Sequence, residues 1–278
     1  MMNTNPKTEG AFTLSELLVV LAIIAILAGM LLPTLARAKS KAQSTACISN
    51  LRQLQTAWFI YVTDHDDWLP PSISASARNV PGSWVLGNAK LDVNTSNIEA
   101  GLLWEYSRSA SIYRCPADRS TVLSNKSARR TRSYSMNAWL RSKVSNDPNG
   151  WQIEFGNYLA QRQQYSQILI PGPSDVFVFI DEHEQSIYDG EFHVSQANPS
   201  DALMKNNQQG EDPSTAAAWL KLPADRHNQG ANLSFADGHV KSHHWTAPKV
   251  FKFYGQPAAQ GQDLQDLRFV QSLIPRLQ

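Results

Sequence analysis

The sequence predicts an α+β protein in which a long N-terminal membrane-spanning helix packs on a small antiparallel-sheet head. Three observations predict this class: an uncharged apolar run at residues 17–32, a buried-strand pattern at 175–181, and an Asp-Gly hairpin signal at 237–238. We expect the chain to divide as follows: a leader at 1–11, the transmembrane half of a stem helix at 12–32, its amphipathic half at 33–65, an α+β head at 66–246, and a tail with a short helix at 247–278.

The composition excludes several classes of protein. Lys and Arg (25) nearly balance Asp and Glu (24), which gives a net charge of +1. A general nucleic-acid binder needs a basic excess, so no nucleic acid is expected as a partner. A mean hydropathy of −0.35 excludes a protein made mainly of membrane spans. Two cysteines are too few for a disulfide scaffold or a cysteine-rich zinc site.

The apolar segment at residues 12–32 is about 31 Å long as a helix, which matches the hydrocarbon core of a bilayer. An ordinary core helix does not fit, because residues 17–32 have no polar face. A secretory signal peptide has a shorter apolar region without an acid, although residues 36–38 resemble its small-residue cleavage site. A plain membrane anchor leaves Glu16 unexplained, since a carboxylate near the membrane centre costs about 2.5–3.5 kcal/mol.

Residues 10–20 resemble the type III signal of type IV pilins and type II secretion pseudopilins. In that family a membrane peptidase cuts before an aromatic or apolar residue and N-methylates the new N terminus, and a glutamate lies four residues later. The resemblance implies a pilin-like fold, a cut between Ala11 and Phe12, and methylation of Phe12. It also implies that Glu16 acts in assembly by pairing with the amino group of a neighbouring subunit. Two departures from the family are Ala11 in place of the usual glycine and Ser15 in place of an aliphatic residue.

The same resemblance implies the partners and the location of the chain. The partners are prepilin peptidase, other pilin or pseudopilin subunits, an inner-membrane assembly platform and the lipid bilayer. The chain would cross the bacterial inner membrane once, with its head in the periplasm or in a cell-surface filament. The positive-inside rule alone favours the opposite orientation, because Arg37, Lys39 and Lys41 follow the span.

The function implied is that of a structural subunit rather than an enzyme, in a type II secretion pseudopilus or a type IV pilus-like filament. Two alternatives stay open. One is a membrane-anchored extracytoplasmic binding protein that does not polymerise, and the other is an enzyme with a metal in the head.

Periodicity predicts the remaining elements. Residues 34–63 contain no proline or glycine and predict an amphipathic helix continuous with the span. Its inward stripe consists of Leu35, Ala42, Leu51, Leu54, Trp58 and Tyr61. In the head we expect a helix at 97–106, strands at 112–114, 133–136 and 175–181, a hairpin at 232–244 and a final helix at 264–274. The hairpin should have a two-residue type I′ turn, which pairs Phe235 with Val240.

His227 lies ten residues before Asp237. This spacing resembles the H-X9-DG element near the carboxyl end of a large group of bacterial prepilin-type proteins. Weak candidates for metal ligands are Asp181, Glu182, His183, His227, Asp237 and His239. Such oxygen-plus-imidazole sets suit Ca²⁺ or another divalent metal. Turn and strand-end positions explain the same residues, so the sequence predicts neither a metal nor another cofactor.

Two further features are open to more than one interpretation. Cys47 and Cys115 can form one disulfide if the head lies outside the cytoplasm, and two unpaired thiols fit nearly as well. A basic cluster is expected to be a solvated loop, with a partner or DNA contact as the alternative. It consists of Lys126, Arg129, Arg130 and Arg132.

Overall fold

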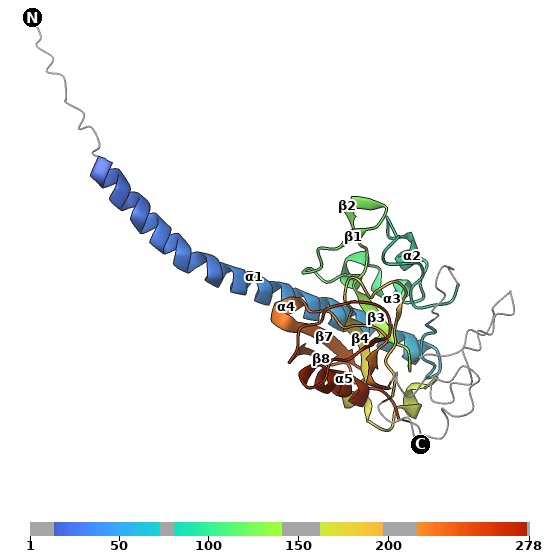
Figure 1. Ribbon diagram of the computed structural model, residues 1–278. Coiled ribbons are helices and arrows are strands. Elements are labelled where there is room, and N and C mark those ends of the chain that lie inside the picture. Colours follow the sequence, from blue (N-terminus) through green and yellow to red (C-terminus); the bar gives the residue numbers. More distant parts are fainter. Residues whose placement is uncertain (1–13, 73–80, 141–161, 197–215, 277–278) are drawn as a thin grey trace, which may run out of the picture. The chain divides into compact units, whose positions relative to one another are not determined.

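A single helix, α1 (Leu14–Asp64), forms the N-terminal part of this computed structural model (Figure 1). The structure describes residues 14–72, 81–140, 162–196 and 216–276. The chain forms two compact units, residues 1–42 and 43–278, and the boundary between them lies within α1. The helix continues through Pro33, which confirms the prediction of one helix across the apolar and amphipathic halves.

The described residues of the first unit, 14–42, contain the apolar half of α1. Its large side chains are exposed, from Leu14 to Leu32, and no polar stripe separates them. Pro33 has no N–H to donate, and the adjacent Thr34 hydroxyl donates to the carbonyl of Leu31 at 2.8 Å. By length and composition, α1 is the one described helix able to cross a membrane. A helix that is apolar on all sides needs lipid or other helices around it.

The second unit begins with the amphipathic half of α1, residues 43–64. Four residues of the predicted inward stripe are buried: Leu51, Leu54, Trp58 and Tyr61. Leu35 and Ala42 are exposed, so the prediction is wrong for these two, because the second unit begins only at Gln43. The stripe starts instead at Cys47, which is completely buried.

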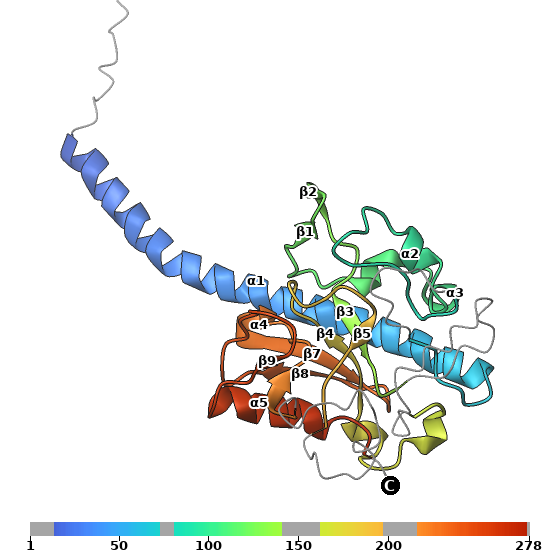
Figure 2. The ribbon, with the colours of Figure 1, turned by 45° about the vertical axis from the view of Figure 1, so that its right-hand side comes forward.

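A five-stranded sheet lies at the centre of the head in the order β5-β3-β4-β7-β8 (Figure 2). Its strands are β3 (Tyr134–Asn137), β4 (Phe177–Asp181), β5 (Glu191–Phe192), β7 (Gly230–Phe235) and β8 (Val240–His244). Neighbours are antiparallel except β3 and β5, which run parallel. The predicted strands at 133–136 and 175–181 are confirmed as β3 and β4, and every residue of β4 is buried, as its pattern predicted.

Helices pack on both faces of this sheet. One core cluster joins Leu54 and Trp58 of α1 to Val178 of β4. A second core cluster joins Leu267 of α5 (Gln262–Ser272) to Leu233 of β7. The sheet therefore lies between the amphipathic half of α1 and α5, which confirms the predicted C-terminal helix (Figure 2).

Polar contacts fix these two helices to the head. The Ser234 hydroxyl on β7 donates to Gln55 Oε1 of α1 at 2.8 Å. Beside α5, Asp266 accepts hydrogen bonds from the backbone N–H groups of Thr246 and Ala247, both at 3.0 Å, and from Lys249 Nζ at 2.6 Å. Burial would raise the pKa of Asp266, but these donors outweigh it and lower the pKa below its usual value.

The remaining elements are short: α2 (Ser96–Glu99), α3 (Trp104–Ser107), η1 (Ala110–Tyr113), η2 (Tyr165–Gln167), η3 (Pro173–Asp175), α4 (Arg226–Gln229), β1 (Thr121–Val122), β2 (Asn125–Arg129), β6 (Ala218–Trp219) and β9 (Gln256–Pro257). The expected helix at 97–106 is interrupted and forms α2 and α3 instead. The expected strand at 112–114 is wrong, because 3₁₀-helix η1 covers most of it.

The β7–β8 hairpin is present, but its turn differs from the prediction. The backbone N–H of Phe235 donates to the His239 carbonyl and that of Gly238 donates to the Phe235 carbonyl, each at 2.9 Å. The loop thus has three residues, and Val240 pairs with Ser234 rather than Phe235. A type I′ turn needs two residues with positive φ. Here Gly238 has positive φ (98°) and Asp237 does not, which favours a turn followed by a glycine bulge.

Candidate functional site: the N-terminal segment and the buried polar clusters of the head

The N-terminal signal lies at the start of α1. Glu16 is exposed and lies in the first helical turn, where the helix dipole favours a negative charge. The cleavage positions Ala11 and Phe12 fall outside the described residues. The apolar surface that follows Glu16 has the width and length of a membrane span or of a helix within a bundle.

Four side chains from distant parts of the chain meet inside the head: Cys47 of α1, Cys115 after η1, Asp181 at the end of β4, and His227 of α4. We call them the thiol cluster. One donor atom from each residue lies within 4.8 Å of the others. Both cysteines are free thiols with no exposed surface, and Asp181 has none either. The His227 side chain is 4% exposed.

The distances within the thiol cluster are those of direct contact. Cys115 Sγ lies 3.2 Å from His227 Nε2, and the same nitrogen lies 3.6 Å from Asp181 Oδ2. The Tyr134 hydroxyl donates to Cys47 Sγ at 3.1 Å. Asp181 Oδ2 is buried and has no hydrogen-bond partner among the described residues.

An unusual backbone conformation places His227 in the cluster. His227, Asn228 and Gln229 all have positive φ, at 58°, 64° and 62°. Such left-handed residues cost of order 1–3 kcal/mol each when they are not glycine, so surrounding contacts must hold them. Gln229 supplies two of these contacts with Trp245, because the Trp245 N–H donates to the Gln229 carbonyl and Gln229 Nε2 donates back, both at 2.8 Å.

A buried arginine neutralises the carboxylate of the cluster. Arg226 forms an ion pair with Asp181, lies 3.6 Å from Asp118 Oδ2, and donates to the Glu182 carbonyl at 2.9 Å. Burial would lower the pKa of Arg226, but Asp181 and Asp118 outweigh it and raise that pKa. Arg226 therefore stays charged, and it holds the neighbouring oxygen of Asp181 in a fixed direction.

The thiol cluster is poorly suited to cysteine catalysis. The pKa of Cys115 is raised far above its usual range by its contact with Cys47, by burial and by the charge of Asp181, which disfavours the nucleophilic thiolate. In a nucleophile–histidine–acid triad the acid contacts the second ring nitrogen. Here Cys115 and Asp181 both approach Nε2 of His227. Burial lowers the pKa of His227, but Asp181 and Cys115 outweigh it and raise the pKa to about 9.

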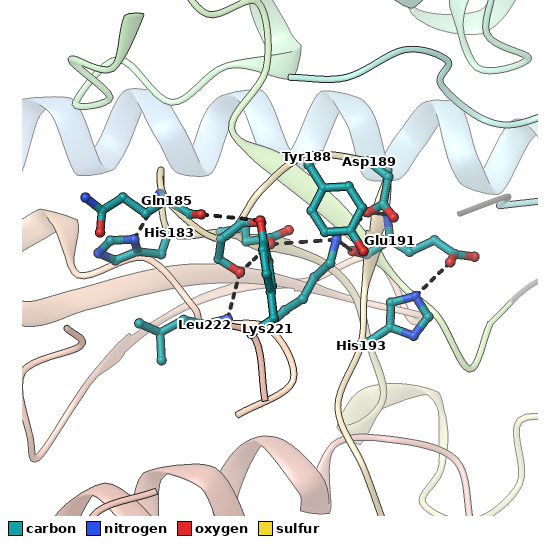
Figure 3. Close-up of polar contacts among 12 residues, drawn as sticks. His183, Gln185, Tyr188, Asp189, Glu191, His193, Lys221 and Leu222 are labelled. Atoms are coloured by element: carbon teal, nitrogen blue, oxygen red, sulfur yellow. Dashed lines mark hydrogen bonds and ion pairs between the residues drawn. The ribbon is translucent and has the colours of Figure 1, made fainter. Parts of the chain in front are cut away.

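A second buried group, the lysine cluster, surrounds Lys221 (Figure 3). The Lys221 side chain is 2% exposed, and its ammonium group is paired with Asp189 and donates to the Glu191 carbonyl at 2.6 Å. It also lies 3.9 Å from Glu182 Oε1 and 4.1 Å from the centre of the Tyr188 ring. Burial would lower the pKa of Lys221, but Asp189 and Glu182 outweigh it and raise that pKa, so the side chain stays a cation.

The lysine cluster includes a second set of residues with metal-ligand spacing. Donor atoms of Asp189, Glu191 and His193 lie within 4.8 Å of one another, and His193 Nε2 contacts Glu191 Oε2 at 2.8 Å (Figure 3). The Lys221 ammonium group already supplies the positive charge at Asp189. These residues were not predicted from the sequence, because no motif or spacing marks them.

The predicted candidate ligands do not form one site. Asp181 and His227 meet, in company with the two cysteines. Glu182 belongs to the lysine cluster, and burial chiefly raises its pKa. His183 stacks on Phe251. On the hairpin turn, Asp237 and His239 contact each other at 2.6 Å and are partly exposed, so they do not belong to either buried cluster.

The expected basic loop is solvated only in part. Lys126 and Arg129 of β2 are exposed. Arg130 and Arg132 are buried, so the expectation of a solvated cluster is wrong for these two. Arg132 donates to backbone carbonyls of residues 86, 87 and 188 at 2.6–3.0 Å, which gives it a role in fixing loops rather than in contacting a partner.

Comparison with known proteins identifies the N-terminal segment. Residues 6–32 match the model of the prokaryotic N-terminal methylation motif. The N-terminal segment is therefore that of a prepilin-type cleavage/methylation protein, and the α+β architecture is consistent with a pilin-like fold. No curated protein and no solved structure matches the chain. The H-X9-DG spacing of His227 and Asp237 remains a resemblance.

The motif limits the class of function. It supports a type IV pilin-like or pseudopilin-like protein, and it implies processing by prepilin peptidase and assembly with other pilin subunits. It points to a structural subunit rather than an enzyme. Together with the apolar helix, it indicates a protein anchored in the inner membrane.

Proposed function

We propose that prepilin peptidase cleaves this chain between Ala11 and Phe12 and N-methylates Phe12. The mature subunit then assembles through its N-terminal helix into a type II secretion pseudopilus or a type IV pilus-like filament. The chain crosses the bacterial inner membrane once, and its head is extracytoplasmic. An assembly platform in the inner membrane is a further partner. The observation that supports the proposal is the methylation motif at residues 6–32, which overlaps the exposed apolar half of α1.

Glu16 gives the assembly its register. A lone carboxylate in hydrocarbon costs about 2.5–3.5 kcal/mol near the membrane centre. Cleavage before Phe12 creates a positive amino group four residues before Glu16, and in a bundle the amino group of one subunit can pair with Glu16 of the next. Pairing removes most of the cost, so the subunits associate at the depth where these two charges meet.

The first experiment is mass spectrometry of the protein purified from its native membrane. We expect a chain that starts at methylated Phe12, and an unmethylated chain with its leader in a strain without prepilin peptidase. An intact N terminus in the strain that contains the peptidase would overturn the proposal. The variant Ala11→Gly restores the residue usual before the cut, and it should be processed at least as completely.

The second experiment tests assembly. Glu16→Ala leaves the amino group of Phe12 unpaired, and removal of one partner from a buried pair costs about 3–5 kcal/mol, which is a loss of about 100-fold or more in subunit association. We expect normal amounts of Glu16→Ala in the membrane fraction and no filaments in the material that shearing releases from the cells. The neighbouring Ser15→Ala is the matched control and should assemble.

Two outcomes would contradict this role. Filaments of Glu16→Ala would show that the carboxylate does not guide assembly. A wild-type chain that is cleaved and methylated, yet stays monomeric in the membrane by crosslinking, would instead indicate an anchored binding protein that does not polymerise.

A further inference from the structure

The thiol cluster has the donor set of a structural zinc site. It offers two sulfurs, one imidazole nitrogen and one carboxylate oxygen, from Cys47, Cys115, His227 and Asp181. Four-coordinate zinc sites of proteins use these atom types, and thiolate ligands favour zinc over calcium or magnesium. We propose that these four residues bind a zinc ion in the interior of the head.

The spacing of the donors fits a tetrahedral ion. Zinc–ligand bonds of about 2.0–2.3 Å place two ligand atoms of a tetrahedron roughly 3.3–3.8 Å apart. The distance from Cys115 Sγ to His227 Nε2 is 3.2 Å, and that from His227 Nε2 to Asp181 Oδ2 is 3.6 Å. All four donors lie within 4.8 Å of one another, so shifts of about 1 Å or less close the coordination sphere.

An unsatisfied buried oxygen points to the same ligand. Asp181 Oδ2 is fully buried and accepts no hydrogen bond from the described residues, although His227 Nε2 lies 3.6 Å away at ion-pair distance. A buried charged oxygen without a hydrogen bond costs stability. A cation bound by this oxygen removes that cost. The other oxygen of Asp181 is held by Arg226, and Cys47 Sγ accepts a hydrogen bond from Tyr134, as surrounding groups commonly orient metal ligands.

The charges also balance. Binding releases the proton of each thiol, and the two resulting thiolates cancel the charge of Zn²⁺. The Asp181 carboxylate is balanced by Arg226, and His227 binds the ion as a neutral imidazole after it releases its ring proton, so it adds no charge. The ion, its four ligands and Arg226 therefore have no net charge, as a site without solvent exposure favours. The neighbouring Asp118, 3.6 Å from Arg226, adds one negative charge, and it accepts hydrogen bonds from the Ser133 hydroxyl and the Ser120 N–H.

The site is structural because four protein atoms fill the coordination of zinc and leave no position for a substrate. It connects residues that lie far apart in the sequence: α1 at Cys47, the segment after η1 at Cys115, the end of β4 at Asp181, and α4 at His227. The contacts that hold His227 in its left-handed conformation keep its ring directed at the other three donors. The proposal is independent of filament assembly, since every ligand belongs to residues 43–278.

The test uses the full-length chain in detergent, purified under reducing conditions. The probes are Zn²⁺, measured by elemental analysis and a chelator competition, and Co²⁺, measured by absorption. We expect one metal ion per chain. We also expect thiolate-to-cobalt charge-transfer bands in the near ultraviolet, together with the intense visible bands of tetrahedral Co²⁺.

Matched variants identify the ligands. Cys115→Ser should lose about half of the charge-transfer intensity, because one of two thiolates is removed. His227→Gln should weaken zinc binding by about 100-fold or more, since even residues behind the ligands alter metal affinity 10–100-fold. His239→Gln on the exposed hairpin and His193→Gln in the lysine cluster are the controls, and both should bind zinc as the wild type does.

Several results would overturn the proposal. One is a reduced wild-type chain that takes up no metal. Another is uptake that Cys115→Ser and His227→Gln leave unchanged. A third is a native chain lighter by two hydrogen atoms with no free thiols, which would show a Cys47–Cys115 disulfide in place of the site. If a variant fails to fold, the cobalt spectrum of the wild type still decides, because its charge-transfer bands arise only from bound thiolate.

Discussion

Replacing Lys221 with methionine removes a positive charge from the interior of the head and keeps a side chain of similar length. The ammonium group of Lys221 is paired with Asp189 and donates to the Glu191 carbonyl (Figure 3). It also lies 3.9 Å from Glu182 Oε1. Methionine supplies neither the charge nor the hydrogen bonds. The two carboxylates therefore stay buried without their cation.

The expected loss follows from this geometry. Removing one partner of a buried pair costs about 3–5 kcal/mol, because the remaining charge is uncompensated. The lysine has 2% of its side chain exposed and Asp189 has 5%, so the upper part of that range applies. For a unit the size of residues 43–278, each kcal/mol lowers Tm by about 2–4 °C, so a loss of about 4–5 kcal/mol gives a total decrease of about 8–20 °C.

Urea unfolding of the full-length chain in detergent, followed by tryptophan fluorescence, measures this loss. The matched control is Lys241→Met, because Lys241 is exposed on β8 and should change the free energy of unfolding by less than about 0.5 kcal/mol. The double variant Lys221→Met/Asp189→Leu removes both charges and should recover part of the stability. A single variant Lys221→Met that loses no more than Lys241→Met would refute the assignment of Lys221 as a buried cation.

Two further predictions concern stability. In Gly101→Ala the new Cβ would lie 2.4 Å from the backbone oxygen of Trp84, so this variant should lose about 1–3 kcal/mol of the free energy of unfolding measured in urea. In the control Gly172→Ala the new Cβ meets no atom within 4 Å, and the free energy of unfolding should be nearly unchanged. Equal effects of the two variants would contradict the packing. Asp266 has a lowered pKa in the folded state, so its contribution to stability is present above its unfolded pKa of about 3.9 and is lost as the pH falls below it. Asp266→Asn should therefore flatten the acid limb of the stability–pH curve, whereas Asp175→Asn, at an exposed position, should leave it unchanged. The same curve for both variants would contradict the prediction.

Local patterns predicted the elements whose evidence is contained in a short stretch of sequence. The apolar run at residues 17–32, the amphipathic pattern at 34–63, the buried strand β4 and helix α5 are each specified by their own local sequence. The hairpin at residues 237–238 was placed correctly with the wrong register, because Asp-Gly is compatible with a two-residue turn and also with a three-residue loop that ends in glycine.

The buried clusters could not be read from the sequence in the same way. Lys221 and Arg132 belong to residue types that are mostly exposed, and their burial depends on partners distant in the chain. From the sequence, Cys47 and Cys115 were candidates for a disulfide and His227 was a weak candidate for a metal ligand, and no motif connected the three. Only the packing of α1 against the sheet brings the two thiols to the same place as the histidine.

Each of the two clusters contains a carboxylate that lies at the end of β4. Asp181 and Glu182 are adjacent, and successive side chains of an extended segment point to opposite sides. Asp181 thus meets Arg226 and Glu182 meets Lys221, and both cations come from one segment, residues 216–229. Each buried carboxylate is costly alone, so this segment must be in place for the sheet to be stable.

Polar groups that neutralise one another inside the head serve its stability, whereas the assembly role proposed for α1 depends on surface outside residues 43–278. Variants of the buried clusters should therefore reduce the amount of folded subunit and leave the pairing of Glu16 with a neighbouring N terminus unchanged.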